Sequence, residues 1–310
     1  MDEARVRATQ RRVEALVGGI DGVVGVAARD LAGGAEVAVN ADEPFPTASV
    51  MKVPILFELY RQAEAGRVDL DRRVPYGPEQ RVPGSGVLQD LAYGLAPTVK
   101  DLATLMITVS DNTATDMVFD LIGAEPLDET IRGLGLTRTA IPLGTRGLLY
   151  SMVGLDTANP AHTYDLFLER SKAGQIDWGS RALADTDNNV STPRDLNRLL
   201  EIIERRERLS DASCAAMLDI LKRQKYNTII PLHLPAEVAV AHKTGSLRGV
   251  RNDAGIVYAP DGPYLISLFA KRLADQVAGA AALAVVSRVV WEGFVGPGPA
   301  PRYGPAPAAG

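Results

Sequence analysis

The sequence of 310 residues contains one cysteine, Cys214, and only three histidines, and these shortages argue against several kinds of site. A single cysteine cannot form an internal disulfide, and we expect it to be a small buried hydrophobic side chain. His162, His233 and His242 are far apart and lack the spacing of a zinc site. We therefore expect neither a metal nor any other cofactor.

The sequence also lacks a dense run of Lys or Arg, and its formal net charge is −5. Surfaces that bind nucleic acids are basic, so no nucleic-acid partner is expected. No segment is expected to be long and apolar enough to span a membrane, because the apolar stretch at 276–294 is rich in Ala and Gly. Residues 1–5 lack a secretory hydrophobic region, so we expect either a cytoplasmic protein or an exported one whose signal was removed. Composition leaves the oligomeric state open.

What the sequence does contain is a segment, 47–54, in which Ser49 and Lys52 are three residues apart. At the start of a helix this spacing puts both side chains on one face, one turn apart. A serine hydroxyl is a weak nucleophile until a base takes its proton, and a lysine is such a base when its pKa is lowered. The pair predicts a nucleophile, Ser49, with Lys52 as its base or relay partner. A helix cap followed by a solvated lysine has the same pattern.

Two further triplets favour the catalytic interpretation. Ser110 begins a Ser-Asp-Asn triplet, and Lys243 begins a Lys-Thr-Gly triplet. In this order the three motifs are those of class A β-lactamases and penicillin-binding proteins. The chain therefore resembles the penicillin-recognising serine hydrolases, most closely the class A β-lactamases, from about residue 4 to residue 294.

Hydrophobic periodicity predicts an α/β (α+β) fold. Five strands are expected, at residues 23–30, 35–40, 238–243, 252–258 and 264–271. Helices are expected at residues 3–17, from 49 onward, and at 99–107, 113–122, 164–172, 192–206, 211–224 and 276–294. Since the strands form hairpins, they should make one antiparallel sheet flanked by the N- and C-terminal helices, with an inserted all-helical lobe. The resemblance implies the same β-lactamase/transpeptidase-like architecture. The expected domains are a sheet domain of 1–47 and 226–296, a helical lobe of 48–225, and a disordered Pro/Ala/Gly-rich tail of 297–310.

The resemblance also implies roles for the motif residues in acyl transfer. Ser49 is the nucleophile, and Lys52 is the base for acylation or a relay partner. Ser110 passes a proton toward the leaving nitrogen, unless it is only a helix N-cap. Asn112 donates its amide to a substrate carbonyl and orients Lys52. Lys243 adds a positive charge that helps to keep Lys52 neutral, unless it is an exposed strand lysine.

Substrate binding is assigned to the residues around the third motif. The N–H groups of Ser246 and Ser49 are the expected oxyanion hole. The hydroxyls of Thr244 and Ser246 are expected to bind a substrate carboxylate, and Gly245 permits close approach of the backbone. Arg251 is either a further carboxylate ligand or a solvated turn residue.

One family feature is missing. Class A β-lactamases carry a Glu-x-x-Leu-Asn pattern whose glutamate activates the deacylating water, and residues 144–193 contain no such pattern. The acidic residues considered in its place are Asp156, Glu169 and Asp187. Without such a base, an acyl-enzyme would form quickly and hydrolyse slowly.

The predicted function is a serine hydrolase that forms an acyl-enzyme on Ser49 with a small-molecule substrate, foremost a β-lactam. A penicillin-binding D-alanyl-D-alanine peptidase, or an esterase or amidase on the same scaffold, is the alternative that the missing glutamate favours. The missing secretion signal argues against a cell-wall substrate. A β-lactam sensor that stays acylated is a further alternative, although the sequence shows no partner domain.

Overall fold

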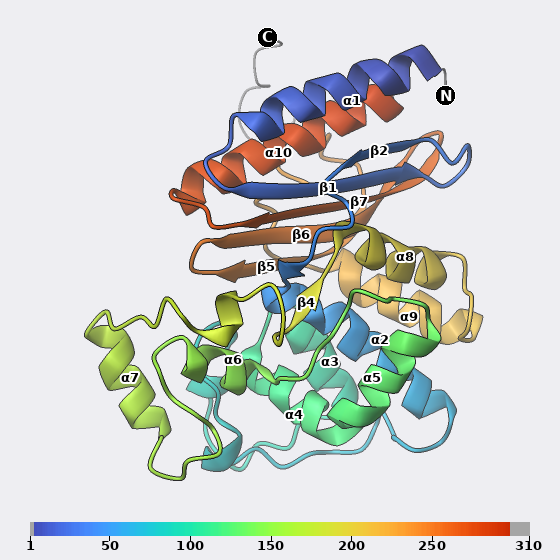
Figure 1. The fold of residues 1–310 in the computed structure, drawn as a ribbon. Helices are drawn as coiled ribbons and strands as arrows, with labels where there is room; N and C mark the ends of the chain where they lie inside the picture. The colour runs from blue at the N-terminus through green and yellow to red at the C-terminus, as the bar shows by residue number, and fades with distance from the viewer. Residues whose placement is uncertain (1–2, 298–310) are drawn as a thin grey trace. The chain divides into compact units, whose positions relative to one another are not determined.

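The computed structural model describes residues 3–297, so all of the predicted tail except residue 297 lies outside the described residues. Packing divides the chain into two compact units (Figure 1). Unit 1 contains the residues up to 50 and from 191 onward, and unit 2 contains residues 51–190. The sheet belongs to unit 1. The predicted domain limits at 48 and 225 stay a prediction.

Unit 1 is built on a five-stranded antiparallel sheet in the order β2-β1-β7-β6-β5, which confirms the predicted fold class. The strands are β1 (Val23–Asp30), β2 (Glu36–Val39), β5 (Val240–Leu247), β6 (Val250–Ala259) and β7 (Gly262–Lys271). Strand β5 runs four residues past its predicted end, because Leu247 still pairs with Val250 across a tight turn. The third motif therefore lies inside an edge strand.

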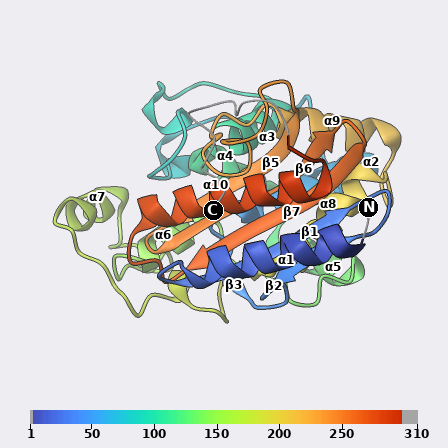
Figure 2. The same cartoon turned by 90° about the horizontal axis from the view of Figure 1, so that it is seen from above.

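Helices cover both faces of this sheet. Helices α1 (Glu3–Gly18) and α10 (Gln276–Phe294) lie side by side on one face (Figures 1 and 2). Helix α8 (Pro193–Glu204) packs against β1, β6 and β7, and α9 (Asp211–Lys222) packs against β5. Both helices belong to unit 1, where their buried faces meet the sheet. Periodicity indicates that a helix has a buried face, but it does not identify the layer that covers this face.

Helix α10 corrects one expectation. Among residues 3–297 it is a helix of 19 residues with a mean hydropathy of 1.5 over its best window, which is long and apolar enough for a membrane span. Its side chains instead enter the core of unit 1, with Leu283, Val286 and Val290 fully buried. Gly293 lies so close to Thr9 of α1 that a Cβ there would overlap the threonine side chain. In this structure α10 is a core helix.

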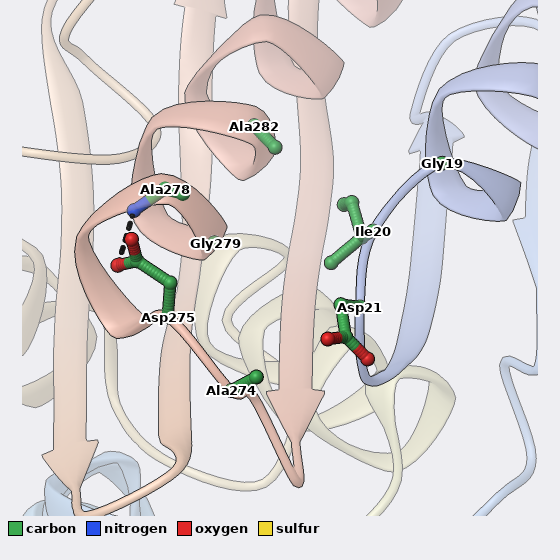
Figure 3. Close-up of a pocket in the computed structure, with 8 residues that line it drawn as sticks. All are labelled: Gly19, Ile20, Asp21, Ala274, Asp275, Ala278, Gly279 and Ala282. Atoms are coloured by element: carbon green, nitrogen blue, oxygen red, sulfur yellow. Dashed lines mark hydrogen bonds between the residues drawn. The ribbon is translucent and has the colours of Figure 1, made fainter.

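A pocket of about 290 Å³ lies in unit 1, where α10 begins (Figure 3). Asp275 caps the helix there, since its Oδ1 accepts hydrogen bonds from the backbone N–H groups of Val277 (2.8 Å) and Ala278 (3.0 Å). The lining residues are Gly19, Ile20, Asp21, Ala274, Asp275, Ala278, Gly279 and Ala282. None of them is a predicted site residue, so we attribute the hollow to the packing of small side chains.

Unit 2 is helical. Its helices are α2 (Lys52–Glu64), α3 (Val99–Thr108), α4 (Asn112–Ile122), α5 (Ala124–Gly133), α6 (Thr145–Ser151) and α7 (Tyr164–Lys172). Sequence analysis located α3, α4 and α7 to within one residue but missed α5 and α6. Gly123 does end α4 as expected, yet it is also the N-cap of α5. Pro126 then lies in the first turn of α5, where proline is tolerated. The remaining strands are short, namely β3 (Phe45–Pro46) and β4 (Val190–Ser191).

Cys214 is fully buried in α9, as expected of a small apolar side chain.

Candidate active site

Ser49 lies in a short 3-10 helix, η1 (Ala48–Met51), that leads directly into α2. The preceding residue, Ala48, has a φ of +47°, a left-handed conformation that is uncommon for a residue with a Cβ. Such backbone strain is concentrated at functional sites, where the surrounding structure maintains it. The backbone N–H of Val50 donates to Thr47 O at 3.1 Å and closes the turn around Ser49.

Lys52 is the first residue of α2 and is fully buried. Its Nζ donates to three acceptors, namely Ser110 O at 2.8 Å, Ser110 Oγ at 3.0 Å and Asn112 Oδ1 at 2.9 Å. Three acceptors match the three donors of an ammonium group. Burial lowers the pKa of Lys52 to about 7, although the charges of Asp111 and Asp116 act in the opposite direction. Burial thus brings the pKa of Lys52 close to neutral pH.

The Ser-Asp-Asn triplet forms the turn before α4. Ser110 has a φ of +54°, and Asp111 rather than Ser110 is the N-cap, with its Oδ1 accepting from Ala114 N at 2.9 Å. The alternative role considered for Ser110, that of the helix N-cap, therefore belongs to Asp111. The other carboxylate oxygen, Oδ2, accepts from Val87 N at 2.7 Å and Leu88 N at 2.8 Å. Asp111 thus ties the triplet to the preceding loop and leaves the Ser110 hydroxyl to Lys52.

That loop brings in a residue that sequence analysis passed over. Ser85 Oγ lies 2.7 Å from Ser110 O and 3.2 Å from Asn112 Oδ1, two acceptors that Lys52 also uses. Asn112 is held further by its Nδ2, which donates to Pro83 O at 2.9 Å, and by its backbone N–H, which donates to Ser85 O at 3.0 Å. The only signal in the sequence was the Gly-Ser-Gly stretch at 84–86, which had indicated a loop.

The Lys-Thr-Gly triplet lies in unit 1. Lys243 is fully buried, so it is not an exposed strand lysine, and its Nζ donates to Thr244 O at 2.7 Å. Gly245 lies against the segment that carries Ser49, because a Cβ on it would be 2.7 Å from Thr47 O and 3.1 Å from Ser49 N. Asn252 of β6 fixes the same segment, donating to Pro46 O at 2.8 Å and Thr47 O at 3.0 Å. A side chain at residue 245 would push the strand away from the Ser49 amide.

The predicted carboxylate ligands lie at the end of β5. Thr244 is nearly buried, whereas Ser246 is exposed and pairs directly with Arg251 of β6, so these last two lie on the same face of the sheet. The Nη1 of Arg251 donates to Leu247 O at 3.1 Å and Val250 O at 2.9 Å. Partial burial lowers the pKa of Arg251. The guanidinium is thus anchored to the β5–β6 turn.

His242, the residue before the triplet, is part of a buried dyad. Its Nδ1 lies 2.9 Å from Asp253 Oδ1, and its Nε2 lies 3.2 Å from Asn227 Oδ1. The other oxygen of Asp253 accepts from Ile230 N at 3.0 Å. This dyad joins β5 and β6 to the chain at 227–230 and so stiffens the strand next to Lys243.

The acidic residues considered for deacylation all lie at the surface of unit 2. Asp156 and Glu169 are exposed, and the carboxylate of Asp187 is 87% exposed and pairs with Arg181 at 2.9 Å. A general base must lie within hydrogen-bond reach of the proton that it takes, whereas these three side chains face solvent. Within residues 3–297, no group of three or more His, Cys, Asp or Glu residues is arranged to hold a metal ion.

The structure therefore gathers the predicted residues into two sets. Within unit 2, Lys52, Ser110 and Asn112 form one hydrogen-bonded network. Within unit 1, Gly245 brings the third motif beside the Ser49 amide. The chain connects the two sets directly, because η1, which contains Ser49, is followed without a break by α2, which begins at Lys52.

Comparison with known proteins settles the family. A model of the β-lactamase enzyme family matches residues 8–294. The chain belongs to this family. Its fold is that of the class A β-lactamases, which confirms the resemblance inferred from the three motifs, and it has the family's serine hydrolase scaffold.

Two curated relatives differ in what they are named for. The extended-spectrum β-lactamase PER-1 of Pseudomonas aeruginosa is 25% identical over 86% of this chain and 80% of its own length. The β-lactamase regulatory protein BlaB of Streptomyces cacaoi is also 25% identical, over 76% of this chain and 79% of its own. Identity at this level therefore accompanies both an enzyme and a regulatory protein.

Among solved structures, a leucine-to-glutamate variant of PBP-A, in its acyl-enzyme complex with penicillin G, aligns with a TM-score of 0.76. It is 30% identical, and the alignment covers 93% of this chain and 96% of that one. A β-lactamase from Sphaerobacter thermophilus aligns with a TM-score of 0.74 at 29% identity, covering 94% of this chain and 97% of that one.

Proposed function

We propose that the protein is a serine hydrolase that is acylated by β-lactams at Ser49 and releases the opened product slowly. One observation carries this proposal: Lys52 is fully buried, its pKa is lowered to about 7, and it is held by Ser110 and Asn112. A base poised near the working pH is what activation of a serine requires.

In the proposed acylation, Ser49 Oγ attacks the lactam carbonyl carbon, and its proton passes to the lone pair of neutral Lys52. The new C–O bond forms as the ring C–N bond breaks. The leaving nitrogen takes a proton from the Ser110 hydroxyl, which recovers one from Lys52 across their 3.0 Å hydrogen bond. Protons and charges balance, and Lys52 ends neutral again.

The groups of unit 1 are proposed to bind the substrate. The N–H groups of Ser49 and Ser246 would stabilise the oxyanion, since such donors act most strongly when they are fixed before the reaction. The Thr244 and Ser246 hydroxyls and the Arg251 guanidinium would bind a carboxylate. The buried cation of Lys243 would favour an anionic substrate.

A second candidate is a penicillin-binding D-alanyl-D-alanine peptidase, or an esterase or amidase with the same nucleophile. The missing glutamate and the likeness to PBP-A favour it. A sensor that stays acylated is the third candidate, and the likeness to the regulatory protein BlaB favours that one. All three share acylation at Ser49 and differ in how the acyl-enzyme is released.

The test is the intact mass of the protein over time after penicillin G is added, with free penicillin followed in parallel. We expect an adduct of the mass of penicillin G that appears quickly and clears as the drug is consumed. An adduct that never clears would refute β-lactam hydrolysis and would favour the peptidase or the sensor alternative. Unmodified protein with intact drug would refute acylation by β-lactams.

Ser49→Ala is the matched control. It removes only the nucleophilic oxygen and should abolish both the adduct and turnover. Ser246→Ala is the comparison variant, because it keeps the backbone N–H proposed for the oxyanion hole and should still be acylated. If Ser49→Ala were acylated like the wild type, the nucleophile would have to be another residue.

A further inference from the structure

The hydroxyl of Ser85 shares its acceptors with Lys52. The two acceptors are the carbonyl oxygen of Ser110 and the side-chain oxygen of Asn112. Ser110 and Asn112 are buried, so each of these oxygens needs a donor from the protein. Each therefore has two donors within reach, one from Lys52 and one from Ser85.

The count of donors changes when Lys52 loses a proton. The ammonium form has three N–H donors for its three acceptors, whereas the neutral amine has two donors and a lone pair. One of the three contacts must then change. Either Ser110 O or Asn112 Oδ1 loses its N–H donor, or the Ser110 hydroxyl turns and donates to the lone pair, which then no longer serves as a base. An unsatisfied buried acceptor is costly, so the network would resist the neutral form unless another donor takes over.

We infer that Ser85 is a positioning residue for Lys52, whose hydroxyl supplies the donor that Ser110 O or Asn112 Oδ1 loses when Lys52 becomes neutral. The single hydroxyl hydrogen can turn to either oxygen, because both lie within 3.2 Å of Ser85 Oγ. This inference rests on the proposed function, in which Lys52 acts as a neutral base.

The backbone holds Ser85 in this place through its two glycine neighbours. Gly84 and Gly86 have φ values of +100° and +106°, which favour glycine. A Cβ on Gly84 would lie 2.7 Å from Asn112 Nδ2, and one on Gly86 would lie 2.4 Å from the Cα of Asp111. The loop is thus closely packed on the Ser-Asp-Asn turn, and a serine between the two glycines is directed by fixed backbone.

The charges acting on Lys52 within unit 2 make such a device useful. Asp111, just before α4, and Asp116, within α4, both stabilise the cation. Burial opposes them and is the larger effect. A hydroxyl that donates to the network when Lys52 is neutral stabilises the neutral form, as burial does. It adds no charge that would stabilise the cation.

The experiment measures the pKa of Lys52 from the ¹³Cε signal of labelled lysine, with Lys52→Met identifying the signal. Ser85→Ala should raise this pKa by about one unit, since an unsatisfied buried acceptor then penalises the neutral form. Ser85→Thr keeps the hydroxyl and should restore the wild-type value. Ser85→Cys keeps the size but weakens the donor, and should give an intermediate rise. Ser151→Ala removes a hydroxyl of unit 2 that is bonded to Leu148 O at 2.8 Å rather than to the partners of Lys52, and should change nothing.

Acylation by penicillin G provides the second readout. In the wild type its rate should fall about tenfold per pH unit below about 7, where Lys52 is protonated. In Ser85→Ala this limb should move upward by the same amount as the titration, while the rate at high pH stays near the wild-type value.

The inference is overturned if Ser85→Ala leaves the Lys52 titration unchanged, if Ser85→Thr behaves like Ser85→Ala, or if Ser151→Ala shifts the titration equally. Because the titration needs no substrate, it tests Ser85 even if penicillin leaves the wild type unmodified. That last result would count against the proposed function alone.

Discussion

Two segments of unit 2 differ sharply in how their polar side chains are used. In residues 82–116, the protein holds the polar side chains through hydrogen bonds. Asn112 Oδ1 accepts from Lys52 and lies 3.2 Å from Ser85 Oγ, and Asn112 Nδ2 donates to Pro83 O. Asp111 Oδ2 accepts from the backbone N–H of Val87. In residues 144–188, the carboxylates of Asp156, Glu169 and Asp187 face solvent, and Asp187 pairs with Arg181 at 2.9 Å.

In terms of the proposed function, this difference concerns the two halves of the reaction, acylation and deacylation. Acylation needs a nucleophile, a neutral base and a proton relay, and the first segment holds the last two in fixed geometry. Deacylation needs a base that activates water, and the three carboxylates considered for it in the second segment, Asp156, Glu169 and Asp187, are exposed. The comparison thus predicts an enzyme that is stronger in its first step than in its second.

The largest expected effect comes from removing the base. Lys52→Met keeps an unbranched apolar stem in a fully buried position but has no lone-pair nitrogen. Acylation by penicillin G should slow by about 10³-fold, within the usual contribution of general acid–base catalysis. Stopped-flow kinetics or the rate of adduct formation by mass gives the number.

Lys100→Met is the matched control for that change, because Lys100 is an exposed lysine in α3. It should acylate at the wild-type rate. Equal acylation by wild type and Lys52→Met, with both proteins folded by circular dichroism, would remove Lys52 from the mechanism and erase the contrast between the two segments.

A smaller effect in the opposite direction is expected from placing a held carboxylate at residue 143, directly before the second segment. Asn189 fixes the backbone of Leu143, accepting from its N–H at 3.0 Å and donating to its carbonyl at 2.7 Å. The same Nδ2 lies 2.7 Å from Met51 Sδ, two residues after Ser49 in the chain. A glutamate at residue 143 would therefore be carried by backbone that Asn189 fixes, and Asn189 also contacts Met51 of η1. Leu143→Glu should shorten the lifetime of the penicillin adduct by about 10²-fold.

Leu143→Gln separates the charge from the change of shape, because it has almost the same size and no basic oxygen. Its adduct should live as long as that of the wild type. If the glutamate and glutamine variants released the acyl group equally fast, the gain would come from loosened packing, and residue 143 would not be a site for a base.

The sheet unit was largely predictable because strand alternation and hairpin turns are local signals. All five strands, and the antiparallel pairing of β1 with β2 and of β6 with β7, follow from runs of apolar residues and their turns. The place of α8 was not predictable, since the bond from Asn197 Nδ2 to Ala27 O joins residues 170 positions apart. Long-range contacts of this kind leave no trace in a local pattern.

The site was predictable to the extent that it consists of motifs. Ser49, Lys52 and Ser110 stand out by spacing and order. Ser85 belongs instead to a loop in which the direction of its side chain depends on the positive φ values of Gly84 and Gly86. The sequence indicated only a loop there, whereas the structure has a turn that packs closely on Asp111 and Asn112. The part that Ser85 plays in the hydrogen-bond network becomes visible only once the positions of Ser110 O and Asn112 Oδ1 are known.

The smallest effect is expected from removing the exposed carboxylates of the second segment. Asp156→Asn, Glu169→Gln and Asp187→Asn, combined in one variant, remove every carboxylate that sequence reasoning considered for deacylation while keeping size and hydrogen bonding. Exposed side chains of this kind contribute little to stability, and the pair of Asp187 with Arg181 is open to solvent. Adduct formation and release should both stay within about twofold of the wild type, as expected for residues outside the reaction. A release rate that fell tenfold or more, with formation unchanged, would mean that one of these carboxylates moves into place after acylation, and the single variants would then show which one. In that case the contrast between the segments would describe the free protein only, and the acyl-enzyme would have to complete its own deacylation site.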